Sequence, residues 1–207
     1  MEIHVMEAVK KLIKKLMGTY PQVRKKYYED VFAAVYDYLD SDKQVTTYRN
    51  AMNTAIATAF LNTGDIAWED GGGELPIEQD VLDWLIAAQE AENANAGILF
   101  QNLRAIRGQE DLNKFEYASA RADGYASTLD RIYSYIKIAA GKDIMLTLVG
   151  DDGEKSCEEC QKYKGKRHKA SWWVKRNLVP GIGSAYSCGG WRCQHTLVDD
   201  SGKIWSL

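Results

Sequence analysis

Apolar side chains recur every three or four positions over most of the first 141 residues, the spacing of an α-helix that buries one face. Residues 5–16 carry such a stripe, with lysines mostly on the opposite side, and Gly18 is a typical helix end. A second helix is predicted from Pro21 to about residue 40. Its predicted core stripe consists of Tyr28, Val31, Phe32, Val35 and Leu39.

Three further helices follow by the same criterion. The alanine-rich segment from Val45 to Asn62 is expected to end at Gly64, and residues 64–76, with three consecutive glycines, predict a hinge-like loop. Residues 77–107 predict a long helix with a weakened, kinked middle at Asn93, Asn95 and Gly97. Its expected core side consists of Val81, Leu82, Leu85 and Ile86. Residues 111–140 predict the last long helix, closed by Gly141.

The pattern changes at residue 142. Residues 144–149 form a short apolar run before the turn sequence GDDG, which is typical of a strand followed by a turn. The run HTLVDDSGKIWSL has two β-prone stretches around DDSG and predicts a terminal hairpin. We therefore expect a mainly α protein, with a bundle-like helical region at residues 1–141 and a small α+β module at residues 142–207.

All four cysteines fall inside that module. Cys157 and Cys160 form a C-x2-C pair, and Cys188 and Cys193 follow, separated by GGWR. Clustered cysteines in a reducing compartment favour a metal site over disulfides, and zinc prefers a tetrahedron of thiolates and imidazoles. We predict that these four cysteines hold one structural Zn2+ that staples the module. His195 is the alternative ligand, either replacing a later cysteine or donating a hydrogen bond to one.

The cysteines have two other interpretations. Reduced cysteines can serve as small core residues, but their clustering disfavours this. A redox-active C-x2-C pair normally follows a βαβ unit, whereas the region before this pair reads as helical. His168, between Arg167 and Lys169, is expected to be solvated rather than a ligand.

The segment between the cysteine pairs is basic. Residues 161–176 contain seven lysines and arginines and no acid. These cations would offset the net charge of about −2 on a zinc ion with four thiolates. The same mixture of cations and aromatic rings can contact phosphates and stack on bases. The candidate nucleic-acid or partner contacts are Lys162, Lys164, Lys166, Arg167, Lys169, Trp172 and Trp173.

Residues from about 118 to 200 resemble the C-terminal region of Mu F-like minor head proteins, the head morphogenesis proteins of tailed phages. In that family an Ala-Arg-containing helix leads to a strand, an acidic turn with C-x2-C, a Gly-Lys turn and a closing Cys-Gly-Gly-aromatic-x-Cys-x-His motif. The matching residues are Ala120–Arg121, Asp152 at the start of DGEKSCEEC, Gly165–Lys166 and CGGWRCQHTLV. Cys188 occupies the histidine position of the commoner family pattern, which favours an all-cysteine site.

The resemblance implies a non-enzymatic structural protein of a phage or prophage head, acting in head morphogenesis or DNA packaging. It implies portal or major capsid protein as partner, several copies in an assembly, and location in a virion head assembled in the host cytoplasm. The alternative function is a nucleic-acid-binding zinc module or small nuclease that uses residues 162–176.

The composition limits which of these functions the chain can have. The net charge of −3 over 207 residues argues against wholesale nucleic-acid binding but allows a local basic patch. Charged residues interrupt every apolar run before the length of a membrane span or a signal peptide, so we expect no membrane partner. The basic N-terminal stripe is expected to be a bundle helix rather than a membrane-surface helix.

Overall fold

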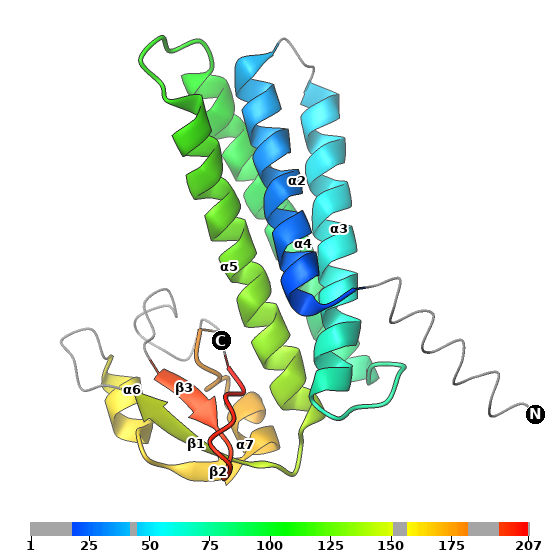
Figure 1. Ribbon diagram of the computed structural model, residues 1–207, viewed down its shortest axis with the longest axis vertical. Coiled ribbons are helices and arrows are strands. Elements are labelled where there is room, and N and C mark those ends of the chain that lie inside the picture. The colour runs from blue at the N-terminus through cyan, green and yellow to red at the C-terminus, as the bar shows by residue number, and fades with distance from the viewer. Residues whose placement is uncertain (1–17, 42–44, 151–156, 182–194, 207) are drawn as a thin grey trace, which may run out of the picture. The chain divides into compact units, whose positions relative to one another are not determined.

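The computed structural model describes residues 18–41, 45–150, 157–181 and 195–206. The described chain is mainly α, with a small antiparallel sheet after the helical region, as the sequence predicts (Figure 1). Its elements are α2 (Tyr20–Asp40), α3 (Val45–Asp70), α4 (Gln79–Ile106), α5 (Lys114–Ala140), β1 (Met145–Gly150), α6 (Glu158–Tyr163), β2 (Arg167–Lys169), α7 (Ala170–Lys175) and β3 (His195–Val198). None of the described helices is both long and apolar enough to span a membrane.

The chain divides into two compact units. The first comprises the described residues up to Thr63 together with Gln89–Ala126, and the second comprises Gly64–Ala88 with the described residues from Ser127 onward. Helices α3, α4 and α5 therefore contribute to both units. The boundary expected at residue 141 falls inside the second unit, because the last turns of α5 pack with the sheet module.

The core of the first unit forms between α2 and parts of α3, α4 and α5. Tyr27 lies at its centre and meets Phe60 and Tyr125 edge-on, with ring centroids 6.5 and 6.4 Å apart. Burial raises the pKa of the Tyr27 hydroxyl far above its ordinary value. Val31, Val35 and Leu39 are buried as predicted, but Tyr28 and Phe32 remain half-exposed, so that part of the predicted stripe is wrong. The inward face of α2 is rotated toward Tyr20, Val23, Tyr27, Ala34 and Tyr38.

Helix α3 does not end at Gly64 but continues to Asp70, so the predicted loop shortens to the residues after it. Gly64 lies within the helix at a close approach. A Cβ there would stand 2.6 Å from Leu85 Cδ2 and 3.3 Å from Ile77 Cδ1. This glycine is required by packing rather than by a helix end.

Helix α4 runs as one assigned helix through the positions where a kink was predicted. Along its predicted core side, Val81 and Leu85 are buried, whereas Ile86 is 46% exposed. In the second unit, Trp84 stacks on Tyr135 of α5, with ring centroids 3.8 Å apart.

The sheet has the order β2-β1-β3, and both pairings are antiparallel (Figure 1). The predicted strand at 144–149 is confirmed as β1, which takes the central position. Leu146 pairs with His168 of β2, and Leu148 pairs with Leu197 of β3. The predicted terminal hairpin is reduced to β3 and a single bridge from Val198 to Ile204.

The segment after β3 is attached to α5 through Lys137. The Lys137 ammonium donates a hydrogen bond to the Ile204 carbonyl at 3.1 Å and lies 5.2 Å from the Trp205 ring centroid. Burial lowers the pKa of Lys137. The Trp205 indole N–H donates to the Asp199 carboxylate at 2.9 Å, which closes the turn between the two β-prone stretches.

Candidate metal centre

The first cysteine pair forms a compact helical turn. Cys157 is the N-cap of α6, and the backbone N–H of Cys160 donates to the Cys157 sulfur at 3.5 Å. Cys160 is 1% exposed, and Cys157 is half-buried. An N–H donor aimed at sulfur favours the thiolate, which is the form that binds metal. The Cys157 sulfur thus accepts a backbone hydrogen bond inside the C-x2-C turn.

Backbone hydrogen bonds hold this turn against the central strand. The N–H of Gly165 donates to the Leu148 carbonyl at 2.8 Å, and the N–H of Leu148 donates to the Lys166 carbonyl at 3.2 Å. Gly165 has a φ of +74°, a left-handed conformation that favours glycine and lets the chain pass from α6 to β2. The Gly-Lys pair singled out in the sequence is therefore the joint between the cysteine turn and the sheet.

His195 opens β3 and is paired with Gly150, the last residue of β1. It is 5% exposed. Because the two strands are antiparallel, the last residue of β1 and the first residue of β3 are at the same end of the sheet. His195, the candidate alternative ligand, therefore lies at the end of the sheet where β1 ends.

Cys188 and Cys193 lie outside the described residues. Within residues 18–41, 45–150, 157–181 and 195–206, no group of three or more histidine, cysteine, aspartate or glutamate side chains is placed to hold a metal ion. Two of the four predicted ligands are therefore not among these residues. The zinc site stays a prediction, and its described half consists of Cys157 and Cys160.

Trp173 is a core residue of the second unit. It is completely buried, and its indole N–H donates to the Leu146 carbonyl at 3.2 Å. Tyr163 and Trp172 meet it edge-on, with centroid distances of 6.4 and 5.1 Å. A ring in this position has no open face for a nucleic-acid base.

Trp172 is half-exposed but covered on its faces. His168 stacks on it with ring centroids 3.7 Å apart and an interplanar angle of 14°, and the Arg176 guanidinium carbon lies 4.3 Å from its centroid. Two groups this close to one ring centre cannot share a face, so they sandwich the indole. His168 is therefore a stacked residue of the module rather than a fully solvated side chain.

The basic residues divide into two sets. On β2, Arg167 donates to Asp200 at 3.0 Å and Lys169 donates to Asp143 at 2.7 Å. These contacts lower the pKa of both carboxyl groups. In the second set, Lys162 and Lys166 are exposed and lie 5.5 and 5.1 Å from the Tyr163 ring centroid, and Lys164 is half-buried. The second set lies on α6 or directly after it, and α6 is the helix that Cys157 caps.

Sequence reasoning missed the acid partners of the basic segment. Asp143 stands just before β1 and Asp200 just after β3, so only folding brings them beside the basic segment. No spacing in the sequence links them to Arg167 or Lys169. The pairing of β1 with β2 places Asp143 beside Lys169, and this pairing could not be read from the sequence.

Comparison with known proteins gives no match: no family model matches the chain, and no curated protein and no solved structure matches it.

Proposed function

We propose that this chain is a non-catalytic structural protein of a phage or prophage head, in which a zinc-stapled module presents a rigid surface to portal or capsid. The supporting sequence features are the C-x2-C, Gly-Lys and CGGWRCQH motifs that resemble Mu F-like minor head proteins. The single structural observation that carries the proposal is the cysteine turn, tied to β1 at the end of the sheet where β3 begins.

In the proposed site, Cys157 and Cys160 supply two thiolates from one turn. Cys193 precedes His195 by two positions, so the covalent chain limits its Cα to within about 7 Å of the first residue of β3. In the proposed site we therefore expect the two cysteine pairs to meet at the end of the described sheet where β3 begins. Cys188 completes the set, and His195 is the alternative fourth ligand.

A zinc ion in this position acts as a staple rather than as a reagent. The described sheet has three short strands, with β2 only three residues long, and α7 packs on it through the buried Trp173. Zinc held by Cys157, Cys160, Cys188 and Cys193 would add a link between the start of α6 and the residues just before β3. The neighbouring lysines, Lys162, Lys164 and Lys166, offset the charge of the thiolate cluster.

The metal is tested by elemental analysis of the purified chain together with a free-thiol assay. We expect one zinc per chain and thiols that react only after a chelator or a denaturant is added. Cys160→Ser and Cys193→Ser should each release the zinc and loosen residues 142–207, while Ser171→Ala, a substitution in the same module, should leave the metal bound. A chain without zinc that contains a Cys157–Cys160 disulfide would refute the site.

The head role is tested separately by co-expression with portal and with major capsid protein. We expect the chain to co-sediment with one of them, and Cys193→Ser to abolish the association. Failure to associate with either protein, with zinc still bound, would reject the head role and leave the metal site standing.

The same preparation tests the nucleic-acid alternative. The coverage of Trp172 and the burial of Trp173 remove the two rings that were the candidates for base stacking. Binding to DNA that weakens with salt and is lost in Lys164→Glu/Lys166→Glu would nevertheless favour the alternative, since phosphate contacts need only the cations.

A further inference from the structure

The outer surface of α3 and α4 in the first unit carries very few charges. Charged residues make up 27% of the whole chain, but residues 45–63 contain only Arg49. Residues 89–106 expose only two charged side chains, Glu90 and Arg104. Exposed faces of helices usually carry many charges, whereas the central part of a protein–protein interface carries few. We call the exposed residues of these two segments the α3–α4 face.

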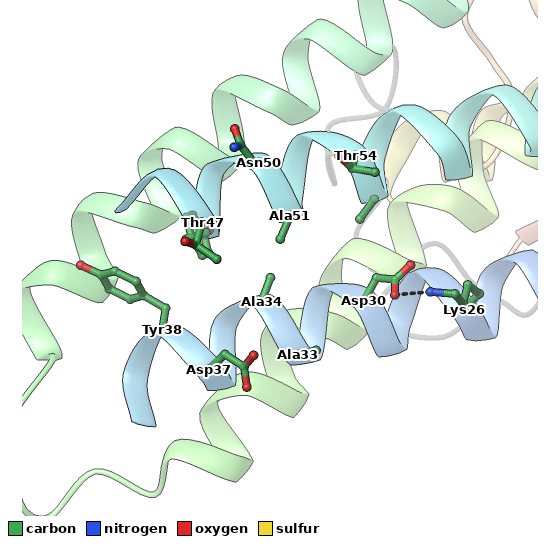
Figure 2. Close-up of a pocket in the computed structure, with 12 residues that line it drawn as sticks. Lys26, Asp30, Ala33, Ala34, Asp37, Tyr38, Thr47, Asn50, Ala51 and Thr54 are labelled. Atoms are coloured by element: carbon green, nitrogen blue, oxygen red, sulfur yellow. Dashed lines mark hydrogen bonds and ion pairs between the residues drawn. The ribbon is translucent and has the colours of Figure 1, made fainter. Parts of the chain in front are cut away.

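The α3–α4 face borders a groove between α2 and α3. This groove of about 490 Å³ is lined on its α2 side by Lys26, Asp30 and Asp37, and Lys26 is paired with Asp30 (Figure 2). Every α3 residue that lines it is uncharged, including Asn50 and Thr54. The change from charged to uncharged side chains therefore occurs at the groove, where α2 gives way to α3.

The middle of the α3–α4 face is not covered by the rest of the described chain. A Cβ at Gly97 would meet no atom within 4 Å, and Ile98 beside it is 63% exposed. Glycine inside a helix is destabilising relative to alanine, and no contact within the described residues requires it at this position. An exposed apolar side chain on a charge-poor helix face is typical of a surface that a partner covers.

The few charges of the α3–α4 face are available to a partner. Arg49 of α3 and Arg104 of α4 both lie over the Phe100 ring, with guanidinium carbons 5.3 and 5.9 Å from its centroid. This shared ring brings the two cations to one end of the face. Among the residues that the structure describes, neither guanidinium has a carboxylate partner, and Glu90 has no cationic one.

The charges along α4 are arranged symmetrically. An exposed line on this helix consists of Glu90, Ala94, Gly97, Gln101 and Arg104. These residues follow one another at alternating intervals of four and three, which keeps them on one side of the helix. Glu90 and Arg104 are each seven residues from Gly97, which is about 10 Å along the helix axis. Two copies of α4 that pack antiparallel about Gly97 therefore place each Glu90 opposite Arg104 of the other copy.

We propose that the α3–α4 face binds a second copy of this chain in a twofold-symmetric dimer. A twofold interface must be complementary to itself, and the antiparallel placement of α4 meets this requirement. Two Glu90–Arg104 pairs stand at the ends of the contact, and the uncharged surface around Gly97 and Ile98 lies between them. Arg49 adds a second cation at each end. The inference uses no residue of the cysteine turn and does not rest on the proposed function.

Other occupants fit the α3–α4 face less well. A nucleic acid is held by several cations that follow its phosphates, but this face offers two, and Glu90 would repel the phosphates. An acidic protein segment would pair with Arg49 and Arg104 and leave Glu90 without a partner. A second copy carries both signs of charge at the matching spacing and pairs all three residues.

The test is sedimentation equilibrium of the full chain. We expect a dimer at roughly 100 µM that dissociates on dilution. Glu90→Arg and Arg104→Glu should each raise the dimer Kd at least about 10-fold, because each substitution places like charges opposite each other. The double variant Glu90→Arg/Arg104→Glu reverses both pairs and should return the Kd to within about threefold of the wild type. Glu116→Arg, the same change at an exposed residue of α5, is the matched control and should leave the Kd unchanged.

Gly97→Glu tests the centre of the contact while preserving the fold. A Cβ at this position meets open space, and glutamate is the better helix former, so the thermal stability of the dilute chain should not fall. In the dimer the two new carboxylates would meet at the twofold axis, so the dimer should be lost. A wild-type chain that stays monomeric at roughly 100 µM would overturn the proposal. A double variant as weak as the single ones, or a Gly97→Glu chain that still dimerises, would overturn it too.

Discussion

Replacement of Trp173 by alanine should unfold the second unit at conditions where the wild type is intact. The side chain is completely buried, and its N–H is hydrogen-bonded to the carbonyl of Leu146 in the central strand. Removing a fully buried tryptophan costs about 3–5 kcal/mol, because the apolar transfer energy and the cavity add. Against a total stability of roughly 5–15 kcal/mol, such a loss is large.

Two further variants divide this effect into parts. Trp173→Phe keeps an aromatic ring but leaves the Leu146 carbonyl without its donor, which should cost about 1–3 kcal/mol. Trp172→Ala removes the contacts with His168 and Arg176 from a half-exposed ring and should cost about 1–2 kcal/mol. The predicted order of stability is therefore wild type, Trp172→Ala, Trp173→Ala.

Urea unfolding followed by tryptophan fluorescence measures this order. All six tryptophans fall in the sequence ranges of the second unit, so the signal reports on that unit and not on the first. If Trp173→Ala shifts the free energy of unfolding by less than about 1 kcal/mol, the described packing of α7 on the sheet is refuted. If Trp172→Ala proves the more destabilising variant, the assignment of core and surface between the two rings is reversed.

Three other substitutions follow from the same structure. Gly64→Ala should destabilise the protein by about 1–3 kcal/mol in thermal melts, because the new Cβ would meet Leu85. Gly124 on α5 faces open space, so Gly124→Ala should stabilise the protein by about 0.5–1 kcal/mol. Equal effects of the two substitutions would refute the close approach at Gly64. Burial lowers the folded-state pKa of Lys137, so wild-type stability should rise with pH between that pKa and 10.5, and in Lys137→Met the rise should vanish. Hydrogen bonds hold the pKa of Asp199 well below its usual range. The stabilisation by Asp199 should therefore be present at neutral pH, decline in acid as the pH falls through the folded-state pKa, and be absent at every pH in Asp199→Asn. For Lys137 and for Asp199 alike, parallel curves of stability against pH for variant and wild type would contradict the prediction.

The long helices were predictable because their apolar spacing persists over many turns, and β1 because its apolar run is short and followed by GDDG. Helix ends were harder. In the sequence Gly64 indicates a helix end because glycine commonly follows a helix, but in the structure its missing Cβ admits Leu85 from another helix. A packing requirement between distant segments leaves no local signal, so the sequence could not separate the two meanings of this glycine.

The candidate site was predictable only in its residue types. The C-x2-C spacing indicates one half of a zinc site, and Gly165 was recognisable as a turn. The pairing of β1 with β2 was not predictable, because a strand of three residues is too short to show an alternation of apolar and polar side chains. The burial of His195 likewise depends on its pairing with Gly150, a contact between residues far apart in the sequence.

That pairing has a consequence for the order in which the chain acquires its structure. Helices α2–α5 can form from neighbouring residues as soon as these are synthesised, and β1 and β2 are separated by one short helix. The central strand β1, however, lacks one of its two neighbouring strands until β3 has been synthesised. Until then its backbone N–H and C=O groups on that side are unpaired. The interval between the syntheses of β1 and β3 is therefore the period in which the nascent chain is most exposed to mispairing, and early capture of a metal by the first cysteine pair would not shorten it.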